Sequence, residues 1–572
     1  MKKVYIILSI IIVLVTGVYL GIRYGLLGTK EYKPDRSKEK SVLDLRPSII
    51  AKMQQLVKDG SGGLYRLTVE QVEPHLSTSS LQVINASISP DSAAIKSLNN
   101  MQQLPDDIFR ISFCSLQVEG IGIRDIIAGD KLSLSRISIN NPVIEIYHKK
   151  RNYDRPGDTL NLYQKISKHF KKIMVSTVAI TDATIISHNK NKGTQNRVDH
   201  VNMTLNDILV DSASQYDRHR KLFANRLELD VKNYSAKTPD GLYQLKFGAV
   251  HISGTDDKLT ASNVELKPAL SRQQFQARFA TRKEMFYITI PAMNLTGINW
   301  WLLMNEGALT ARYALMKNAR CSVYLSRAKP FRKVKPNNFP HQMILGLPVP
   351  IAISKISIRN AQLVYTEYNP GMEQTGTITV DRMHGETTNI TNIPDSIRKN
   401  NFMTIRASGM FLGKVPLTAG FRFNLARAKT GDFSMNLEIT NIDSSTLNRI
   451  TIPMAEFMLK KGIIQKGIAQ VSGNNYKTHG TGVLLYTDLY LIAVKKDKNE
   501  PGQFDKKSFL SRIANTVLIK NNNPSGDKEP RTVDFDFNRE PQLTFFSLIW
   551  KTIYIGILKI IGLPESFANR SY

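Results

Sequence analysis

A short alternating unit that occurs four times constrains the fold of this chain more than any other feature. It reads apolar-x-apolar-x-(Asn/Asp)-(Ala/Pro)-x-apolar, and its copies are residues 81–88, 137–144, 178–185 and 356–363. Apolar and polar residues that alternate with a period of two predict strands with one apolar face. Asn or Asp before Ala or Pro suits a β-bulge or a tight turn between the two halves. A repeated unit of this kind predicts an elongated, rolled sheet with an apolar face along its length.

The net charge of +29 limits the classes of partner. A large positive field attracts nucleic acids and anionic membranes. The densest basic clusters, at 165–172, 218–221 and 329–335, lack the interleaved aromatic residues of a nucleic-acid module. We therefore expect a membrane-facing or envelope role and no nucleic-acid partner.

The N-terminus predicts a membrane anchor. Lys2 and Lys3 precede an apolar run from Val4 to Ile22, which is long enough to span a bilayer. No small-residue cleavage site follows, so we interpret residues 1–28 as an uncleaved transmembrane signal-anchor. The two lysines favour a cytoplasmic N-terminus, whereas the basic residues between Arg23 and Lys40 favour the opposite orientation.

The rest of the chain divides into four segments. Residues 29–63 read as a linker and a short helix over 48–58, and residues 64–500 as one repetitive β-domain with few helices. Within that domain, helices are expected over 160–172 and 298–316, the second of which contains Trp300 and Trp301. Residues 501–543 are predicted to form an extended tail and residues 544–572 an apolar, amphipathic helix.

The C-terminal helix permits two interpretations. Wound as a helix, it places Ser547, Lys551, Thr552, Gly556, Lys559 and Gly562 on one side and apolar residues on the other. The helix then either lies in a membrane interface or caps the end of the sheet. The first interpretation predicts membrane contact through Phe545, Phe546, Ile549, Trp550 and Ile553.

No motif in the chain predicts catalysis. The sequence has no His-Glu-x-x-His, Gly-x-Ser-x-Gly or P-loop, and its ten histidines show no metal-ligand spacing. The nearest patterns, His384-Gly385-Glu386 and His479-Gly480, are expected at strand ends or turns. Cys114 and Cys321 are expected to be buried thiols. We predict a protein that is not an enzyme and has no catalytic residue, metal or cofactor.

The remaining candidate site is the apolar face itself. An apolar sheet face must be covered, and it forms either a closed core or a groove that acyl chains fill. The residues predicted to line this face come from the four repeated units: Val83, Ile88, Ile139, Ile144, Ile180, Ile185, Ile358 and Leu363.

The combination of these features resembles the AsmA-like family of bacterial envelope proteins, which includes TamB and YhdP, and more distantly the bridge-like lipid transfer proteins. The residues that carry the resemblance are Val4–Ile22, the Asn-Ala-type units and the Gly-x-Gly…Tyr-x-Asp-Leu segment 480–489. Residues 514–524, Arg539-Glu540 and the helix 545–563 are similar to the tail of Bacteroidota-type members.

The resemblance implies an inner-membrane anchor, a periplasmic β-groove and no transferable catalytic residues. Its implied role is to bind or conduct phospholipid toward the outer membrane, or to support outer-membrane assembly. Possible contacts at the far end are the outer membrane or an envelope protein, reached through the C-terminal helix. The alternative is a structural or scaffold protein of the envelope in which the same face is a dry core. An anchored enzyme is the least favoured hypothesis.

Overall fold

The computed structural model describes residue 44 and residues 46–121, 131–153, 171–191, 193–217, 219–238, 240–330, 338–496, 504–506, 519–539 and 543–564. The fold is mainly β with few helices, as the alternating pattern predicts. The predicted anchor at 4–22 and nearly all of the predicted helix at 160–172 lie outside the described residues.

The chain forms two compact units. Unit 1 contains the described residues up to Ala236 together with Lys246–Ala261 and Trp300–Glu306. Unit 2 contains Lys237–Leu245, Ser262–Asn299 and the described residues from Gly307 onward. Three strands contribute residues to both units: β8 (Ala224–Lys237), whose last residue belongs to unit 2, β9 (Tyr243–Ser253) and β10 (Lys258–Pro268).

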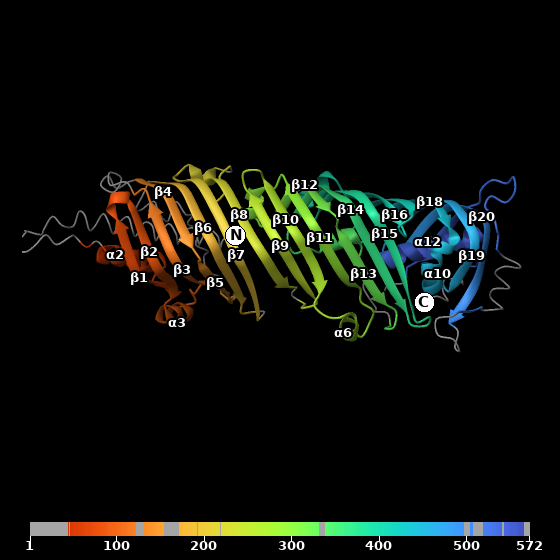
Figure 1. Cartoon of the computed structure of the whole chain (residues 1–572), viewed down its shortest axis with the longest axis horizontal. Helices are drawn as coiled ribbons and strands as arrows, with labels where there is room; N and C mark the ends of the chain where they lie inside the picture. The colour runs from red at the N-terminus through yellow and green to blue at the C-terminus, as the bar shows by residue number, and fades with distance from the viewer. Residues whose placement is uncertain are drawn as a thin grey trace, which may run out of the picture. The chain divides into compact units, whose positions relative to one another are not determined.

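Unit 1 begins with a helix that packs on the first strand. Its main elements are α2 (Arg46–Gly60), β1 (Tyr65–His75), β2 (Ser80–Pro90), α3 (Ser92–Asn100), β3 (Asp107–Glu119), β4 (Lys131–Asn140), β5 (Val143–His148), β6 (Lys172–Asn189), β7 (Thr194–Val210) and β8 (Ala224–Lys237). Strands β1, β2 and β3 pair antiparallel and lie side by side in Figure 1. The predicted helix over 48–58 is confirmed as α2.

Two short strands occupy one place in the sheet of unit 1. Strands β4 and β5 both pair antiparallel with β3 and parallel with β6. Strands β6, β7 and β8 then continue antiparallel. The parallel step from β5 to β6 requires the chain to cross over between them.

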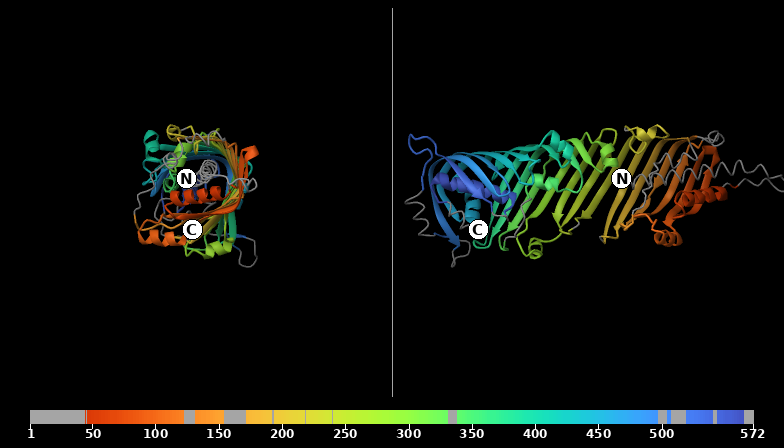
Figure 2. Two further views of the ribbon diagram at one scale, coloured as in Figure 1. Left: turned by 90° about the vertical axis from the view of Figure 1, so that its left-hand side faces the viewer. Right: turned by 180° about the vertical axis from the view of Figure 1, so that it is seen from behind.

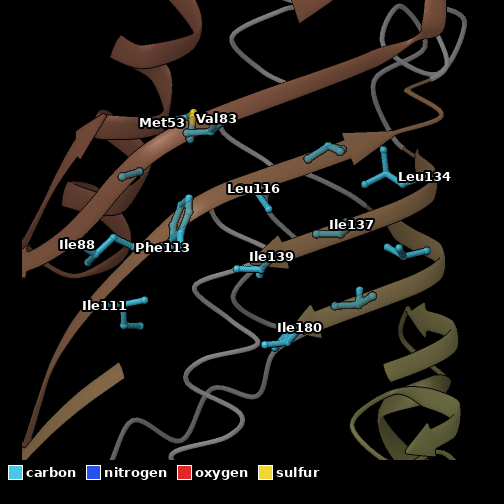
Figure 3. Close-up of a cluster of buried hydrophobic side chains, with 14 of the residues drawn as sticks. Met53, Val83, Ile88, Ile111, Phe113, Leu116, Leu134, Ile137, Ile139 and Ile180 are labelled. Atoms are coloured by element: carbon cyan, nitrogen blue, oxygen red, sulfur yellow. The ribbon is translucent and has the colours of Figure 1, made fainter. Parts of the chain in front are cut away.

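The apolar face of unit 1 is a continuous buried cluster. Side chains from β2 to β7 point to one side and meet Ile49, Met53 and Val57 of α2. Figure 3 shows Met53 next to Val83, with residues of successive strands aligned on the same side. The period of two in the sequence produces this alignment, because alternate side chains share a face.

Unit 2 repeats the same topology and then extends it. Its main elements are α6 (Arg272–Ala277), β11 (Met285–Thr296), β12 (Leu309–Lys317), β13 (Arg320–Ser326), α8 (Pro340–Leu345), β14 (Ile351–Asn369), β15 (Gln374–Thr391), α9 (Pro394–Lys399), β16 (Phe402–Phe411), β17 (Val415–Asn424), β18 (Phe433–Asp443), α10 (Asn448–Ala455), β19 (Phe457–Gly473), β20 (Lys477–Lys496), β21 (Phe504–Lys506), β22 (Thr532–Asn538) and α12 (Phe545–Ile561). Strands β12 and β13 pair antiparallel with β11 and parallel with β14, and all later pairs are antiparallel.

The C-terminal helix caps the last strands of unit 2. Helix α12 packs on β20 and β22, and the right-hand view of Figure 2 shows it in deep blue against the blue strands. Its contact face contains the residues that the sequence pattern placed on the polar side. Thr552 bonds Thr478 across 2.9 Å, Lys551 lies over Phe537, and Gly556 leaves room for the Phe535 ring. Helix α12 therefore packs as a cap on the last strands of the sheet, as the second interpretation predicts.

The structure corrects several expectations. The helix predicted over 298–316 is wrong: only α7 (Trp300–Asn305) is helical, and β12 follows, because the alternating pattern of 309–317 outweighs the helical spacing of the tryptophans. Part of the predicted tail, β22, is a sheet strand bonded to β20. Cys114 and Cys321 are free thiols, but Cys114 is exposed.

The two His-Gly patterns also lie within strands, β15 and β20, and not at turns. A larger residue would be crowded at position 385, because a Cβ there would lie 3.1 Å from the Arg406 carbonyl oxygen. His479 Nδ1 is hydrogen-bonded to Asp536 Oδ1 at 3.0 Å.

Candidate functional site

All four repeated units have Asn or Asp in a left-handed conformation at the expected position, and two of the units contain a bulge. Asn85, Asn141, Asp182 and Asn360 have positive φ angles of 46°, 48°, 55° and 54°. Register shifts follow Ile180 in β6 and Ile358 in β14. Asn and Asp tolerate this left-handed conformation better than other non-glycine residues, which explains why the unit requires them. The predicted bulge is therefore confirmed in residues 178–185 and 356–363.

The structure shows two further copies of the unit that the sequence search missed. Asn263 in β10 and Asn318 between β12 and β13 have φ angles of 50° and 55°. They belong to 259–266 and 314–321, in which Val264 replaces the small residue and Ala314 the first large apolar one. A search for Asn after an alternating run, with the next residue left free and Ala accepted at the first apolar position, would have found both.

The six copies belong to a tandem structural repeat. Strands β1, β2 and β3 begin at Tyr65, Ser80 and Asp107, and β9, β10 and β11 begin 178 residues later, at Tyr243, Lys258 and Met285. The first repeat thus runs from β1 to β7 and the second from β9 to β15. Within β3–β5 and β11–β13, matching residues are 177 and not 178 residues apart. Gly120 and Gly297, which both have positive φ, are one such pair. In both repeats, two short strands lie between an antiparallel neighbour and a parallel one. The neighbours are β3 and β6 in the first repeat and β11 and β14 in the second.

Matching interactions support the repeat. The Phe109 backbone N–H donates to the Tyr65 hydroxyl at 3.1 Å, and the Phe286 N–H donates to the Tyr243 hydroxyl at 3.3 Å. Gly120 and Gly297, with φ of 72° and 66°, lie against Ser135 and Arg312. Each of these pairs of positions differs by 177 or 178 residues.

Bulges on neighbouring strands are also linked in both repeats. In the first, the Asn141 side-chain amide donates to Asp182 Oδ2 at 3.0 Å. In the second, the Asn360 amide donates to Asn318 Oδ1 at 2.8 Å. The residues with positive φ on neighbouring strands thus lie next to each other in both repeats.

In the first repeat, the predicted lining residues are buried. Val83, Ile88, Ile139, Ile144 and Ile180 are at most 6% exposed. Ile185 is partly buried against the same cluster. This face is a closed core, to which α2 contributes three side chains.

In the second repeat, the matching face is partly open. Ile358 is only partly buried, whereas the corresponding Ile180 is buried, and Leu363 is partly buried like its counterpart Ile185. Six more large apolar residues of unit 2 at matching positions are also partly buried, namely Leu266, Ile288, Ile290, Met293, Met316 and Ile356. Leu295, Val323 and Ile353, which match Val118, Ile146 and Val175, are buried. Several fully buried positions of this face are alanines: Ala261, Ala314 and Ala361.

Two local differences account for the open face. Ala261 and Ala314 stand where the first repeat has Val83 and Ile137, so the side chains are shorter. The positions that correspond to α2 belong to β8, so the second repeat has a strand where the first has a covering helix. A hollow of about 680 Å³ also lies on β15–β18, where Gly385, Ala407 and Ala419 are among its small lining residues.

The other end of unit 2 is closed by aromatic rings. Phe545, at the start of α12, is 8% exposed and packs against Phe339, Phe423 and Phe433, with ring centroids 5.3–5.6 Å apart. Phe546 is 43% exposed, whereas Ile549, Trp550 and Ile553 are partly buried. Membrane contact through these residues remains a prediction, and the buried position of Phe545 argues against its own part in it.

Ionisable groups lie next to the aromatic cluster. The Tyr365 hydroxyl donates to Glu367 Oε2 at 2.8 Å, and Arg327 Nε lies 3.6 Å from Glu367 Oε1. Burial raises the pKa of Glu284 to about 7, and a hydrogen bond with the Thr544 side chain opposes this rise. Thr544 also caps α12 by accepting the Ser547 N–H. These contacts connect the start of α12 to β11 and β14.

The described residues include no group of three or more His, Cys, Asp or Glu side chains placed to hold a metal ion. Within the same residues, no helix is both long enough and apolar enough to cross a bilayer. The candidate site is therefore the partly open apolar face of the second repeat.

Comparison with known proteins adds no assignment. No family model matches the chain, and no curated protein matches it either.

Proposed function

We propose that this is a membrane-anchored envelope protein that binds lipid acyl chains along the apolar face of its second repeat. The observation that carries the proposal is the contrast between two equivalent faces, one of which is closed while the other leaves large aliphatic side chains partly exposed. Exposed aliphatic surface in a row of strands is unfavourable in water and favours an apolar ligand.

In this proposal, the acyl chains lie on the strands and the head groups remain in water. Transfer then avoids exposing hydrocarbon, which costs about 0.8 kcal/mol per CH₂ group. The resemblance to AsmA-like proteins supports a phospholipid ligand, an inner-membrane anchor at Val4–Ile22, a groove-like rolled sheet in the periplasm and a role in outer-membrane assembly. The C-terminal helix is then the candidate contact with the outer membrane or with an envelope protein.

A structural or scaffold role is the second candidate function. The closed core of the first repeat and the aromatic cluster around Phe545 favour it, because neither leaves room for a ligand. This alternative makes the second repeat a poorly filled core and predicts that no lipid copurifies.

Lipid occupancy of the full chain tests the proposal. The protein is extracted in mild detergent, and copurified phospholipid is quantified by mass spectrometry. We expect about one or more lipids per chain in the unmodified protein and at least a fivefold loss in a variant with Ile358→Asp and Leu363→Asp. A matched control, Arg359→Asp, changes the charge of an exposed neighbour and should retain the lipid. The absence of lipid from the unmodified protein would favour the scaffold role.

A further inference from the structure

A hollow lined mainly by polar residues lies over four neighbouring strands of unit 2, β15 to β18. It is the hollow of about 680 Å³ described above, and its volume lies within the range of small-molecule sites. Its central row crosses all four strands, because Glu386 is opposite Arg406, Arg406 is opposite Gly420, and Gly420 is opposite Asn436. Opposite residues of paired strands point to the same side of a sheet, so these residues share one face.

Hydroxyl groups flank this central row. On one side Ser408 is opposite Thr418, and on the other side Arg422 lies between Thr404 and Ser434. All five residues line the hollow. Serine and threonine hydroxyls both donate and accept hydrogen bonds, as the asparagine amide of the central row does. The hollow therefore offers several neutral hydrogen-bonding groups around its arginines.

Two arginines supply the positive charge of the hollow. Arg406 and Arg422 are exposed and are diagonal neighbours on β16 and β17, a relation that places their Cα atoms roughly 7–8 Å apart. The Arg422 guanidinium lies over the Phe402 ring, 3.5 Å from its centroid. Two separate cationic groups thus lie within the span of one small ligand.

The acidic residues nearby have other partners. Glu386 Oε1 lies 2.5 Å from Lys355 Nζ, and Glu438 Oε1 of β18 lies 2.8 Å from Lys466 Nζ. The hydrogen bond with Lys355 lowers the pKa of Glu386, so this carboxylate stays charged and paired. Within the part of the chain that the structure describes, neither Arg406 nor Arg422 forms an ion pair. An anion that binds them therefore displaces no carboxylate.

Gly420 shapes the floor of the hollow. It lies in the interior of β17 and has no positive φ, so the backbone conformation does not require glycine. Glycine weakens the interior of a strand and often marks a place where another group approaches closely. A Cβ at this position would collide with Asn436 Oδ1. Glycine thus allows the Asn436 amide to lie on the floor, within the central row.

We propose that this hollow binds an acidic carbohydrate, with the anionic groups of the sugar on Arg406 and Arg422 and its hydroxyls among the surrounding hydroxyl and amide groups. Guanidinium groups bind carboxylates and phosphates through paired, charge-assisted hydrogen bonds. A bare anion would leave the hydroxyl groups unused, and a nucleic-acid base would need an uncovered aromatic ring, whereas Arg422 covers Phe402. The site goes beyond the proposed lipid binding and uses none of the aliphatic residues assigned to acyl chains.

Isothermal titration calorimetry of the full chain, in a detergent without a sugar head group, tests the proposal. The probes are digalacturonate and glucose 1,6-bisphosphate, each of which carries two anionic groups on a carbohydrate. Neutral cellobiose and inorganic phosphate are the matched controls. We expect at least one acidic sugar to bind about tenfold more tightly than either control, because only the acidic sugars combine charge-assisted bonds with hydroxyl contacts.

Three variants locate the site. Arg406→Gln removes one guanidinium group, and Gly420→Val fills the floor with a residue that strands favour. Each should weaken binding of the acidic sugar about tenfold. Arg449→Gln changes an exposed arginine of α10 outside the hollow and should bind as the unmodified protein does. Unaltered thermal unfolding confirms that each variant folds.

Failure of both acidic sugars to bind would overturn the proposal, and so would binding that Arg406→Gln leaves unchanged. Equally tight binding of inorganic phosphate or of a tetra-aspartate peptide would reveal a general anion surface and would also overturn it. Copurified lipid should be the same in Arg406→Gln as in the unmodified protein, so this test is independent of the proposed function.

Discussion

The first and second repeats share strand order, bulge positions and a tyrosine hydrogen bond, yet they differ in how they cover the apolar face. In the first, Ile180 is 6% exposed within a cluster that α2 joins. In the second, the equivalent Ile358 is partly open. The backbone pattern therefore does not determine whether the face is a core or a binding surface. Side-chain size and the preceding element, a helix or a strand, make the difference.

The largest expected effect comes from one substitution made at equivalent positions. Ile180→Asp places a charge in a closed core and should lower the free energy of unfolding by roughly 4 kcal/mol or more, enough to unfold unit 1. Ile358→Asp leaves the carboxylate access to water and should cost about 1–2 kcal/mol while lipid is lost. Urea unfolding of the full chain in detergent measures both. Equal losses of stability would show that the second face is also a closed core.

Alanine at the two equivalent glycines should cost less than Ile180→Asp. Both have positive φ, so Ala is strained at either site by about 1 kcal/mol. A Cβ on Gly120 would also lie 2.8 Å from the Ser135 backbone nitrogen, whereas a Cβ on Gly297 would contact Arg312 side-chain atoms, of which the Cβ at 2.9 Å is held by the backbone and the others can move. We expect losses of about 3 kcal/mol for Gly120→Ala and about 1–2 kcal/mol for Gly297→Ala, measured by thermal unfolding. A larger loss at Gly297 would contradict this order.

Glu284 of unit 2 is buried, whereas the equivalent Asp107 of unit 1 pairs with His148 at 2.9 Å. Burial raises the pKa of Glu284 to about 7, above its usual 4.5, so the folded state binds a proton that the unfolded state has released. Its stabilising effect is complete below pH 4.5 and is lost as the pH rises through 7. The unfolding free energy of unit 2 should fall by about 1–3 kcal/mol between pH 4.5 and pH 8, because a tenfold change in proton affinity corresponds to roughly 1.4 kcal/mol.

The control for this prediction uses the two repeats. Glu284→Gln should flatten the pH dependence of the unfolding free energy of unit 2. Asp107→Asn, which removes the partner of His148, should leave that pH dependence unchanged. Melting temperatures measured across the pH series suffice. If the melting temperature of Glu284→Gln still falls with pH as in the unmodified protein, another group causes the pH dependence.

The smallest effects concern the bulges, where the repeats should behave alike. Asn141→Ala and Asn318→Ala each place alanine at a positive φ and remove a hydrogen bond with a neighbouring bulge. Each should lower the unfolding free energy by about 1–2 kcal/mol, while Asn→Gly at the same sites should cost about half as much because glycine relieves the strain. Thermal unfolding of the four variants checks this. Clearly unequal losses would show that the bulges differ in the two repeats.

The local backbone of this protein could be predicted from its sequence. Alternation indicated the strands, and Asn or Asp before Ala or Pro indicated the bulges, because both features depend on neighbouring residues only. The tandem repeat was missed because Val264 and Ala314 depart from the strict pattern, although their backbone geometry is the same.

Which residues are covered could not be predicted in this way. Ile180 and Ile358 occupy the same place in the same motif, and their exposure depends on residues distant in the sequence. The packing of α12 could not be decided from its own residues for a related reason. Its small and polar side, with Thr552 and Gly556, fits closely against β20 and β22, while Leu548, Ile555 and Leu558 are buried as well, so the helix is packed on both sides.

The tandem repeat also gives the molecule a unit of growth. Strand β7 pairs antiparallel with β8, and β15 pairs antiparallel with β16, so each copy ends on the same kind of edge. Duplicating or deleting a whole copy leaves compatible strands on both sides and needs no new junction. Each copy contributes six strand positions, because its two short strands share one place, or roughly 29 Å of sheet. Evolution can therefore adjust the reach of such a protein in fixed increments, and each added copy can be specialised as a support or as a binding surface by a few side chains.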